Sequence, residues 1–303
     1  MQELKPKRSP LFYVGDKYKL MNQLNKLFPS NINRFIDIFC GGGSASLNTK
    51  ANHYVLNDAN SYVIELHHLL LKHSRNTKEL VDYFYNEINS YKLSHSEKSM
   101  PSELQKLKEI YKKTYFAKYN KNNYLKLRDD YNKYRNTERL YLLLVYGFNH
   151  MIRFNSKNEF NLPVGNVDWN KNVTKALLDY GEWASKNHIN IYNSDFDLLL
   201  RNFSFQHGDF LYCDPPYLIT SSEYNKVWSE KEELALYKLL DELHKQGIVW
   251  GLSNMLFHKG KENIILKDWA NKYTIFNIKS NYISRFDNSV KKDSNEIYVT
   301  NFN

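Results

Sequence analysis

Phe210-Leu211-Tyr212-Cys213-Asp214-Pro215-Pro216-Tyr217 joins a short apolar run to a stiff polar turn. The first four residues predict a buried strand. The two prolines fix φ at successive positions and remove two backbone donors. Because ligands of open α/β sheets bind just past the carboxyl ends of strands, a carboxylate, carbonyls and a ring at this point suit a flat ligand that carries an amine. A rigid surface turn is the alternative reading of the same stretch.

A second strand, Phe35 to Phe39, leads into Cys40-Gly41-Gly42-Gly43-Ser44 and a helix through Leu47. Glycines let a backbone approach a ligand closely, so this turn predicts a nucleotide-binding entry. The turn is not GxGxxG and lacks the lysine of a P-loop, which disfavours ATP hydrolysis. The next strand, Tyr54 to Leu56, ends at Asp58. This carboxylate can bind ribose hydroxyls, or it can cap the helix predicted from Ser61 to Leu71.

Composition narrows the class of protein. The chain has 303 residues and 42% hydrophobic side chains, which suits one large domain or a core domain with an inserted lobe. No run approaches 18 apolar residues and no signal peptide is visible, so we expect a cytoplasmic protein without a membrane span. The two cysteines predict no disulfide framework. A net charge of +9 favours a polyanionic partner.

The middle of the chain changes character. Residues 77–139 are rich in Lys, Tyr and Asn and predict an inserted helical lobe, followed by a buried helix from Leu140 to Phe148. A hairpin is then predicted over 148–165, with its turn at Ser156 to Asn158. Its Arg and Asn side chains are the donors expected of a ribbon that reads bases. An ordinary surface hairpin is the alternative.

The remaining pattern completes an α/β fold. Ile189 to Tyr192 predicts a strand that ends in Asn193-Ser194-Asp195-Phe196, where a polar and aromatic pair can hold an adenine or where Asp195 can cap a helix. Helices are predicted at 18–28, 173–185, 230–245 and 259–272, and further strands at 248–252, 273–278 and 296–300. No histidine or cysteine spacing indicates a zinc site, and no Gly-x-Ser-x-Gly elbow is present.

Five motifs occur in an order that resembles one family. They are Tyr13-Val14-Gly15-Asp16-Lys17, the Asp37 to Gly43 segment, Asn57-Asp58, Ile152 to Lys157 and Asp214-Pro215-Pro216-Tyr217. This combination resembles the Dam family of DNA adenine-N6 methyltransferases, and within it the enzyme of T-even phages. The similarity covers nearly the whole chain, and only residues 94–119 look additional.

The resemblance implies a Rossmann-like catalytic domain that uses S-adenosylmethionine and no metal, with an inserted, mainly helical target-recognition domain that bears the hairpin. It implies catalytic-domain segments at 1–75 and 169–303 around a recognition domain at 76–168. The implied cofactor-binding residues are Tyr13, Lys17, Phe39, Gly41, Gly43, Asp58, Asp195, Phe196 and Asp214. Asp214, Pro215, Pro216 and Tyr217 would hold the target adenine. The implied DNA-binding residues are Phe148, Asn149, Met151, Arg153, Asn155 and Pro163.

These implications lead to a specific reaction. We expect methyl transfer from S-adenosylmethionine to the N6 amine of an adenine flipped out of double-stranded DNA, by a monomer or weak dimer. The family target GATC is expected, although Asn166-Val167 stand where the family usually carries basic residues. Three alternatives remain: the same chemistry on RNA or a protein amide, an NAD-dependent oxidoreductase, and a DNA-binding protein without catalysis.

Overall fold

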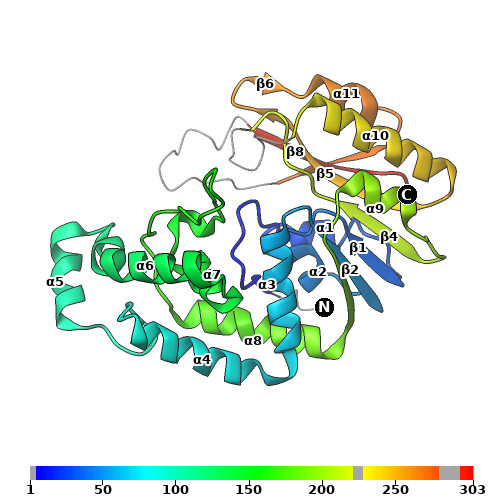
Figure 1. The fold of residues 1–303 in the computed structure, drawn as a ribbon. Helices are drawn as coiled ribbons and strands as arrows, with labels where there is room; N and C mark the ends of the chain where they lie inside the picture. Colours follow the sequence, from blue (N-terminus) through cyan, green and yellow to red (C-terminus); the bar gives the residue numbers. More distant parts are fainter. Residues whose placement is uncertain (1–4, 221–227, 280–293, 303) are drawn as a thin grey trace. The chain divides into compact units, whose positions relative to one another are not determined.

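The computed structural model describes residues 5–220, 228–279 and 294–302. Its contacts divide the chain into two compact units. The first unit comprises residues 1–6, 17–59 and 188–303, and the second comprises 7–16 and 60–187. These bounds differ from the boundaries near 75 and 168 that were predicted between the catalytic and target-recognition domains. The predicted boundaries separate domains by their expected roles, and they remain a prediction. We describe each unit by itself (Figure 1).

The first unit is built on one mixed sheet. Its described strands are β1 (Arg34–Asp37), β2 (His53–Asn57), β3 (His188–Tyr192), β4 (Asp209–Cys213), β5 (Val249–His258), β6 (Lys261–Glu262), β7 (Thr274–Ile278) and β8 (Ser294–Thr300). Their order is β3-β2-β1-β4-β5-β8-β7, and β6 pairs with β5. Strands β1 to β5 are parallel, whereas β8 runs antiparallel to both β5 and β7. This is the expected α/β class, with a sheet that is mostly parallel.

The strand order reverses direction between β1 and β4. These two strands pair in parallel, with Asp37 opposite Tyr212. From β1 the chain proceeds to β2 and β3 on one side, and from β4 to β5 on the other. Such a switch point is where ligands bind in open α/β sheets. The glycine turn and the Asp214 loop therefore leave adjacent strands at this position.

Each face of the sheet is covered by apolar side chains. On one face, α9 (Phe196–Asn202), α10 (Glu230–Lys245) and α11 (Ile264–Ala270) contribute to a core that includes Leu211, Trp250 and Leu252 (Figure 1). On the other face, the ring of Phe28 lies 5.0 Å from Phe210 and 5.2 Å from Tyr212. Both clusters are removed from water, and this burial is the dominant favourable term in folding.

Two predicted helices are shorter than expected. The only helix within 18–28 is α1 (Met21–Leu24), and the only helix within 259–272 is α11, which follows the short strand β6. Lys259 and Gly260 have φ of 49° and 76°, so the chain reverses there and β6 pairs back onto β5. A helix cannot pass through two left-handed residues. The helix begins instead after Asn263, whose side chain caps it by accepting from the Leu266 N–H.

The second unit is helical, as predicted for most of its length. Its helices are α3 (Ser61–Lys72), the 3₁₀ turn η1 (Ser74–Asn76), α4 (Thr77–Ser90), α5 (Ser102–Tyr111), α6 (Tyr115–Tyr134), α7 (Thr137–Tyr146), the 3₁₀ turn η2 (Phe148–His150) and α8 (Lys171–Lys186). Every residue of α7 from Leu140 to Tyr146 is buried. Buried His67 of α3 lies 2.9 Å from the Tyr180 hydroxyl of α8, and this contact ties these helices together within one unit.

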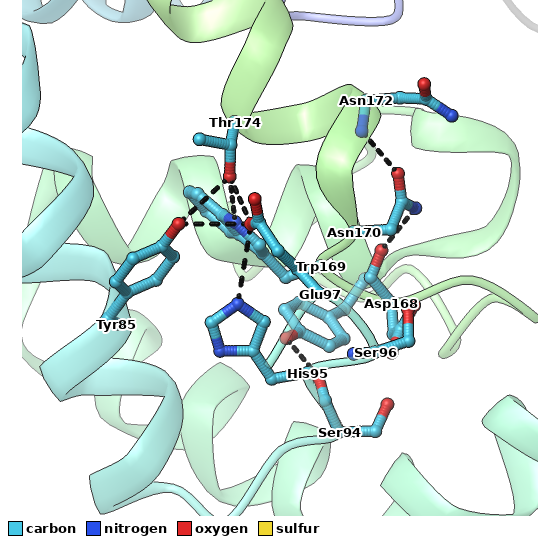
Figure 2. Close-up of polar contacts among 11 residues, drawn as sticks. Tyr85, Ser94, His95, Ser96, Glu97, Asp168, Trp169, Asn170, Asn172 and Thr174 are labelled. Carbon is cyan, nitrogen blue, oxygen red and sulfur yellow. Dashed lines mark hydrogen bonds and ion pairs between the residues drawn. The ribbon is translucent and has the colours of Figure 1, made fainter. Parts of the chain in front are cut away.

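A polar network fastens the loop before α5 to the start of α8. Figure 2 shows Tyr85, His95, Glu97 and Thr174 around the Trp169 ring. Asp168 accepts from both the backbone N–H and the hydroxyl of Ser96, at 2.7 and 2.8 Å. The Asp168 carboxylate and the Trp169 indole N–H each have a hydrogen-bond partner here, which offsets much of the cost of burying them. These contacts connect the 94–98 loop to the start of α8.

Candidate active site

Four loops meet at the carboxyl edge of the parallel strands in the first unit. The Asp214 loop follows β4, the glycine turn follows β1, Asp58 follows β2, and Asp195 follows β3. Because these strands are parallel, their carboxyl ends lie along one edge of the sheet. The predicted positions in these loops are therefore brought to one side of the first unit.

A buried ion pair lies at the centre of this edge. Lys17 is 5% exposed, and its Nζ lies 2.9 Å from Oδ2 of Asp214. The same Nζ lies 3.7 Å from Oε1 of Glu296 and 4.9 Å from the centre of the Tyr217 ring. The Tyr217 hydroxyl lies 3.1 Å from Oδ1 of Asp214 and 2.8 Å from Oε1 of Glu296. One cation, two carboxyl groups and one phenol therefore form a compact cluster.

The surroundings of Asp214 change its acidity. Burial raises the pKa of the Asp214 carboxyl above its ordinary value, and the charge of Glu296 raises it further. Lys17 opposes this rise through its charge and hydrogen bond, as does the Tyr217 hydroxyl. A carboxylate with a raised pKa is a stronger hydrogen-bond acceptor, because acceptor strength follows basicity. Functional sites are enriched in such perturbed groups.

The glycine turn adopts backbone conformations that favour glycine. Gly41 has φ of 46° and Gly43 has φ of 74°. The N–H of Gly41 donates to Oδ2 of Asp58 at 3.0 Å. The predicted alternative for Asp58, capping the following helix, is wrong because Asn60 caps α3 by accepting from the Tyr62 N–H. Asp58 instead supports the turn from the end of β2.

Asp195 and Phe196 occupy different environments. The Asp195 side chain is exposed and caps α9 by accepting from the N–H groups of Asp197 and Leu198. Phe196 is 6% exposed, and its ring centre lies 5.5 Å from that of Phe39 and 5.6 Å from that of Trp228. Of the two roles predicted for Asp195, capping the following helix matches these contacts. Its predicted contact with a cofactor remains a prediction.

The residues present fit S-adenosylmethionine. A glycine turn with positive φ, the Asp58 carboxylate and the rings of Phe39 and Phe196 are the groups that a nucleoside requires. In addition, no residue in the described part of the chain donates to or accepts from the Ser44 hydroxyl, which is buried beside the turn. Buried polar groups are normally hydrogen-bonded, so such a hydroxyl calls for a ligand or water.

A third carboxyl group lies beside this site. Asp37, at the end of β1, is 1% exposed and accepts from the Ser46 hydroxyl at 2.8 Å. Burial raises its pKa to about 7, and the charges of Asp214 and Asp58 contribute to this rise. Asp37 therefore carries a proton over part of the neutral range. Sequence reasoning quoted this residue in a motif and gave it no role.

The predicted hairpin lies in the second unit and is not a regular ribbon. It contains two isolated antiparallel bridges, between Phe154 and Phe160 and between Gly147 and Val164. The backbone N–H and carbonyl of Phe160 bind the side chain of Asn132 in α6, at 2.7 and 3.1 Å. The two arms are joined around the Phe154–Phe160 bridge by backbone hydrogen bonds from the Asn155 N–H to the Glu159 carbonyl and from the Asn161 N–H to the Arg153 carbonyl, at 2.9 and 3.0 Å. The predicted turn is confirmed, with Asn158 at φ of 57°.

Two predicted base-reading side chains have partners within the hairpin. Arg153 donates from Nε and Nη2 to the side chain and backbone carbonyl of Asn161, both at 2.9 Å. Asn155 Oδ1 accepts from the N–H groups of Lys157 and Glu159, which closes the turn. The other predicted DNA-binding positions are Phe148 and Asn149, both exposed, with Met151 partly buried and Pro163 exposed.

Two further predicted positions have specific contacts. Tyr13 is partly buried and belongs to the second unit, unlike the other predicted cofactor residues. Asn166, where the sequence departs from the family, lies against the start of α6. Its Oδ1 accepts from the N–H groups of Phe116 and Ala117 at 3.0 and 3.3 Å, and its Nδ2 donates to the Lys113 carbonyl. Asn166 thus caps a helix that the additional segment begins.

Sequence reasoning missed Glu296. This residue begins the apolar run Ile297-Tyr298-Val299 of β8 and is 1% exposed. In the sequence, the one feature that could have indicated a functional role for Glu296 is its acidic side chain at a position expected to be half buried in a strand. The partners of that side chain come from distant segments, so no local pattern identifies them.

The described residues contain neither a membrane-spanning helix nor a cluster of metal ligands. No helix in this part of the chain is long and apolar enough to cross a membrane. Within the same ranges, no group of three or more His, Cys, Asp or Glu side chains is arranged to hold a metal ion.

Comparison with known proteins identifies the family. Residues 13–283 match the model of D12 class N6 adenine-specific DNA methyltransferases. The chain is 34% identical to Type II methyltransferase M.FokI of Planomicrobium okeanokoites and 33% identical to modification methylase StsI of Streptococcus sanguinis, over 97% of this chain and 43% of each relative. It is 28% identical to the DNA adenine methylase of Haemophilus influenzae, over 74% of this chain and 70% of that enzyme. The chain thus spans less than half the length of the first two relatives. By its match over most of its length, the chain belongs to the D12 class of N6 adenine-specific DNA methyltransferases.

Proposed function

We propose that this protein methylates the N6 amine of an adenine in double-stranded DNA. The observation that carries the proposal is the Asp214-Pro215-Pro216-Tyr217 loop at the switch point, with Asp214 held by a buried lysine. An N6 amine is inaccessible to this chemistry within the base stack, so the base has to leave the duplex. The loop offers a ring for stacking and oxygen acceptors for the amine.

When bound, S-adenosylmethionine supplies the methyl group. The residues proposed to hold it are the glycine turn with Asp58, the rings of Phe39 and Phe196, and Lys17, together with Tyr13, Asp195 and Asp214. Asp58 supports the turn through Gly41, and Phe39 lies against Phe196. These groups provide hydrogen bonds for hydroxyls and a flat apolar wall for a base.

Asp214 and the carbonyl of Pro215 are proposed to accept the two hydrogens of the target amine. Accepting these hydrogens would turn the nitrogen lone pair out of conjugation with the ring, so that it could attack a methyl group in line. The nitrogen–carbon bond would form as the bond between that methyl group and the sulfonium sulfur breaks, and the amine would then lose one proton, to Asp214 or to water. The developing positive charge on nitrogen is stabilised by the carboxylate. Holding the two reactants in this geometry supplies much of the remaining acceleration.

Tyr217 is proposed to stack on the flipped base. Lys17 lies over one face of the ring, 4.9 Å from its centre. The base would therefore stack on the opposite face. The hydroxyl of Tyr217 is tied to Asp214 and Glu296, which fixes the plane of the ring before a base arrives.

The second unit is proposed to read the DNA through Phe148, Asn149, Met151, Arg153, Asn155 and Pro163. Charge supports a polyanionic partner, because residues 94–135 contain 11 Lys and Arg against 5 Asp and Glu. We propose GATC as the first target to test. A different sequence is the competing outcome, because Asn166 caps α6 where the family carries a basic residue.

The test uses tritiated S-adenosylmethionine and DNA duplexes that contain GATC or a variant altered at each base. Label in N6-methyladenine from GATC alone supports both the reaction and the target. Label from other adenine contexts keeps the reaction and rejects GATC specificity. If no duplex is labelled while the cofactor binds, the proposed substrate is wrong, and RNA and protein amides become the next substrates to assay.

A further inference from the structure

Glu296 contacts the proposed catalytic loop from a strand that no predicted site residue occupies. It lies on β8, opposite Met255 of β5, and is 1% exposed. Its Oε1 lies 2.8 Å from the Tyr217 hydroxyl and 3.7 Å from Nζ of Lys17. Both partners also contact Asp214, so the two carboxyl groups share the same two neighbours.

The phenol of Tyr217 has one proton for two acceptors. A tyrosine hydroxyl donates a single hydrogen bond. Oε1 of Glu296 lies at 2.8 Å and Oδ1 of Asp214 at 3.1 Å, and the shorter contact is in the usual range for a hydroxyl donor. By distance, the Glu296 oxygen is the favoured acceptor of this proton. Oδ1 of Asp214 is then left as an acceptor without that donor.

The other oxygen of Glu296 is buried and lacks a donor. No residue in the described ranges donates to Oε2. Leaving a buried acceptor unsatisfied costs about 1–3 kcal/mol, and more for a charged group. Two carboxyl groups against one lysine also leave the cluster one positive charge short. Neither the unsatisfied oxygen nor the excess of carboxyl groups stabilises the fold. Buried polar groups that destabilise a fold are typical of functional sites.

We infer that Glu296 is a positioning residue for methyl transfer: it takes the phenolic proton of Tyr217, so that Oδ1 of Asp214 remains available to the hydrogen of the target amine. This inference rests on the proposed function. Glu296 acts through Tyr217 and Lys17. It orients the stacking ring and shares the lysine, while Asp214 accepts from the amine.

The charged surroundings of Asp214 determine how a substitution of Glu296 changes the pH profile. The titratable groups that act on this carboxyl are Lys17 from the segment before α1, Asp37 from β1, Tyr212 from β4, Tyr217 from its own loop and Glu296 from β8. Glu296 raises the pKa of Asp214 through its charge, and a Tyr217 hydroxyl that donates to Asp214 would lower it. With the phenolic proton on Glu296, substituting Glu296 should therefore move the pH profile, whereas removing the Tyr217 hydroxyl should leave the profile in place.

The experiment measures kcat and KM for DNA methylation from pH 5 to pH 9 in wild type, Glu296→Gln and Tyr217→Phe. In Glu296→Gln, the phenolic proton turns to Asp214, because a neutral amide oxygen is the weaker acceptor. We expect kcat to fall about tenfold or more, which corresponds to the loss of one hydrogen bond to a charged group. The acid limb of the kcat profile should move to lower pH by about 0.5 unit or more, since a like charge has been removed. In Tyr217→Phe, the limb should stay in place, because a phenolic proton held by Glu296 does not act on Asp214.

Glu262→Gln is the matched control. It makes the same change at a partly exposed carboxylate that pairs with Lys267 on the surface, and it should leave both the limb and kcat unchanged. If Glu296→Gln methylates with the acid limb of wild type, the inference is wrong, whatever its effect on kcat. Should Glu296→Gln fail to fold, Tyr217→Phe alone decides, because a limb that moves to higher pH would show that the phenol donates to Asp214 and would overturn the proton assignment. Failure of the wild-type protein to methylate any DNA would instead reject the proposed function itself.

Discussion

Nζ of Lys17 lies 2.9 Å from Oδ2 of Asp214, with the lysine 5% exposed and the carboxylate 17% exposed. The two residues come from segments far apart in the chain, one before α1 and one after β4. Removing one partner of a buried pair leaves an uncompensated charge, which is strongly destabilising. The lysine therefore fixes the position of the carboxylate and at the same time limits the rise in its pKa.

Asp214→Ala should abolish methylation. The variant loses the acceptor for the target amine and also removes the carboxylate nearest to Lys17 in the described part of the chain, while Glu296 remains 3.7 Å from its Nζ. Single-turnover methylation of duplex DNA measures the effect, and a thermal melt shows whether the fold survives. Asp214→Asn keeps one oxygen acceptor and should retain more activity than Asp214→Ala. Appreciable turnover by Asp214→Ala would contradict the proposed role.

Lys17→Met should shift the pH dependence of methylation upwards. Lys17 lowers the pKa of Asp214, so without this cation the carboxylate forms only at higher pH. The acid limb of kcat/KM should therefore move to higher pH, and activity at pH 7 should fall at least tenfold. Lys19→Met is the control, because Lys19 is exposed and nearby in the sequence. An unchanged limb in Lys17→Met would refute the coupling.

Asp37 should make stability fall as pH rises. Its folded pKa of about 7 lies above the ordinary value of 3.8, so the folded protein holds a proton that the unfolded chain releases. The contribution is fully present below the ordinary value and is lost as pH rises through about 7. Each unit of pKa shift corresponds to about 1.4 kcal/mol. We expect a loss of a few kcal/mol, measured by denaturant unfolding.

Asp37→Asn should flatten this dependence between pH 4 and pH 8 because it removes the titrating group. Ser46→Ala should extend the loss to higher pH, since the Ser46 hydroxyl lowers the pKa of Asp37. A wild-type stability that is constant over this range would show that Asp37 does not titrate as described.

Arg153→Ala should relax sequence discrimination. A bidentate arginine contact to guanine contributes about 1–3 kcal/mol of discrimination. The guanidinium also holds Asn161, so a loosened hairpin is a second possible cause of any loss. Asn161→Ala separates the causes, because it removes one of these two bonds and leaves the arginine. If both variants lose discrimination equally in a panel of altered duplexes, Arg153 acts only by holding the hairpin.

Asn166→Ala should destabilise α6 without changing the target. Its side chain accepts from two N–H groups at the start of this helix, and loss of such a cap costs about 1 kcal/mol. Thermal unfolding measures the loss. Asn166→Asp keeps the accepting oxygen and should recover most of the stability. A change of methylated sequence in Asn166→Ala would show instead that this residue reads DNA.

Much of the fold was predictable from local pattern. The strands at β1, β2 and β4 and the amphipathic helix α10 follow from apolar runs and helical spacing, which depend on neighbouring residues. The helix predicted over 259–272 is present only as α11, because the basic start of the segment forms a reversal at Gly260 whose backbone conformation depends on pairing with β5. Residues 280–293, between the strands predicted at 273–278 and 296–300, lie outside the described residues.

The sequence by itself determined which chemical groups the site contains: the Asp214 loop, the glycine turn and Asp58 each follow a strand that its own residues predict. Only the tertiary structure decided which of these groups meet. Lys17, from the segment before α1, contacts both Asp214 and Glu296, and Glu296 lies on β8, which pairs antiparallel with β5. Asp195 caps a helix and Asn132 binds the hairpin backbone because each side chain satisfies the nearest unpaired backbone groups. Partners of this kind are chosen by distance in space, which the order of residues along the chain does not specify.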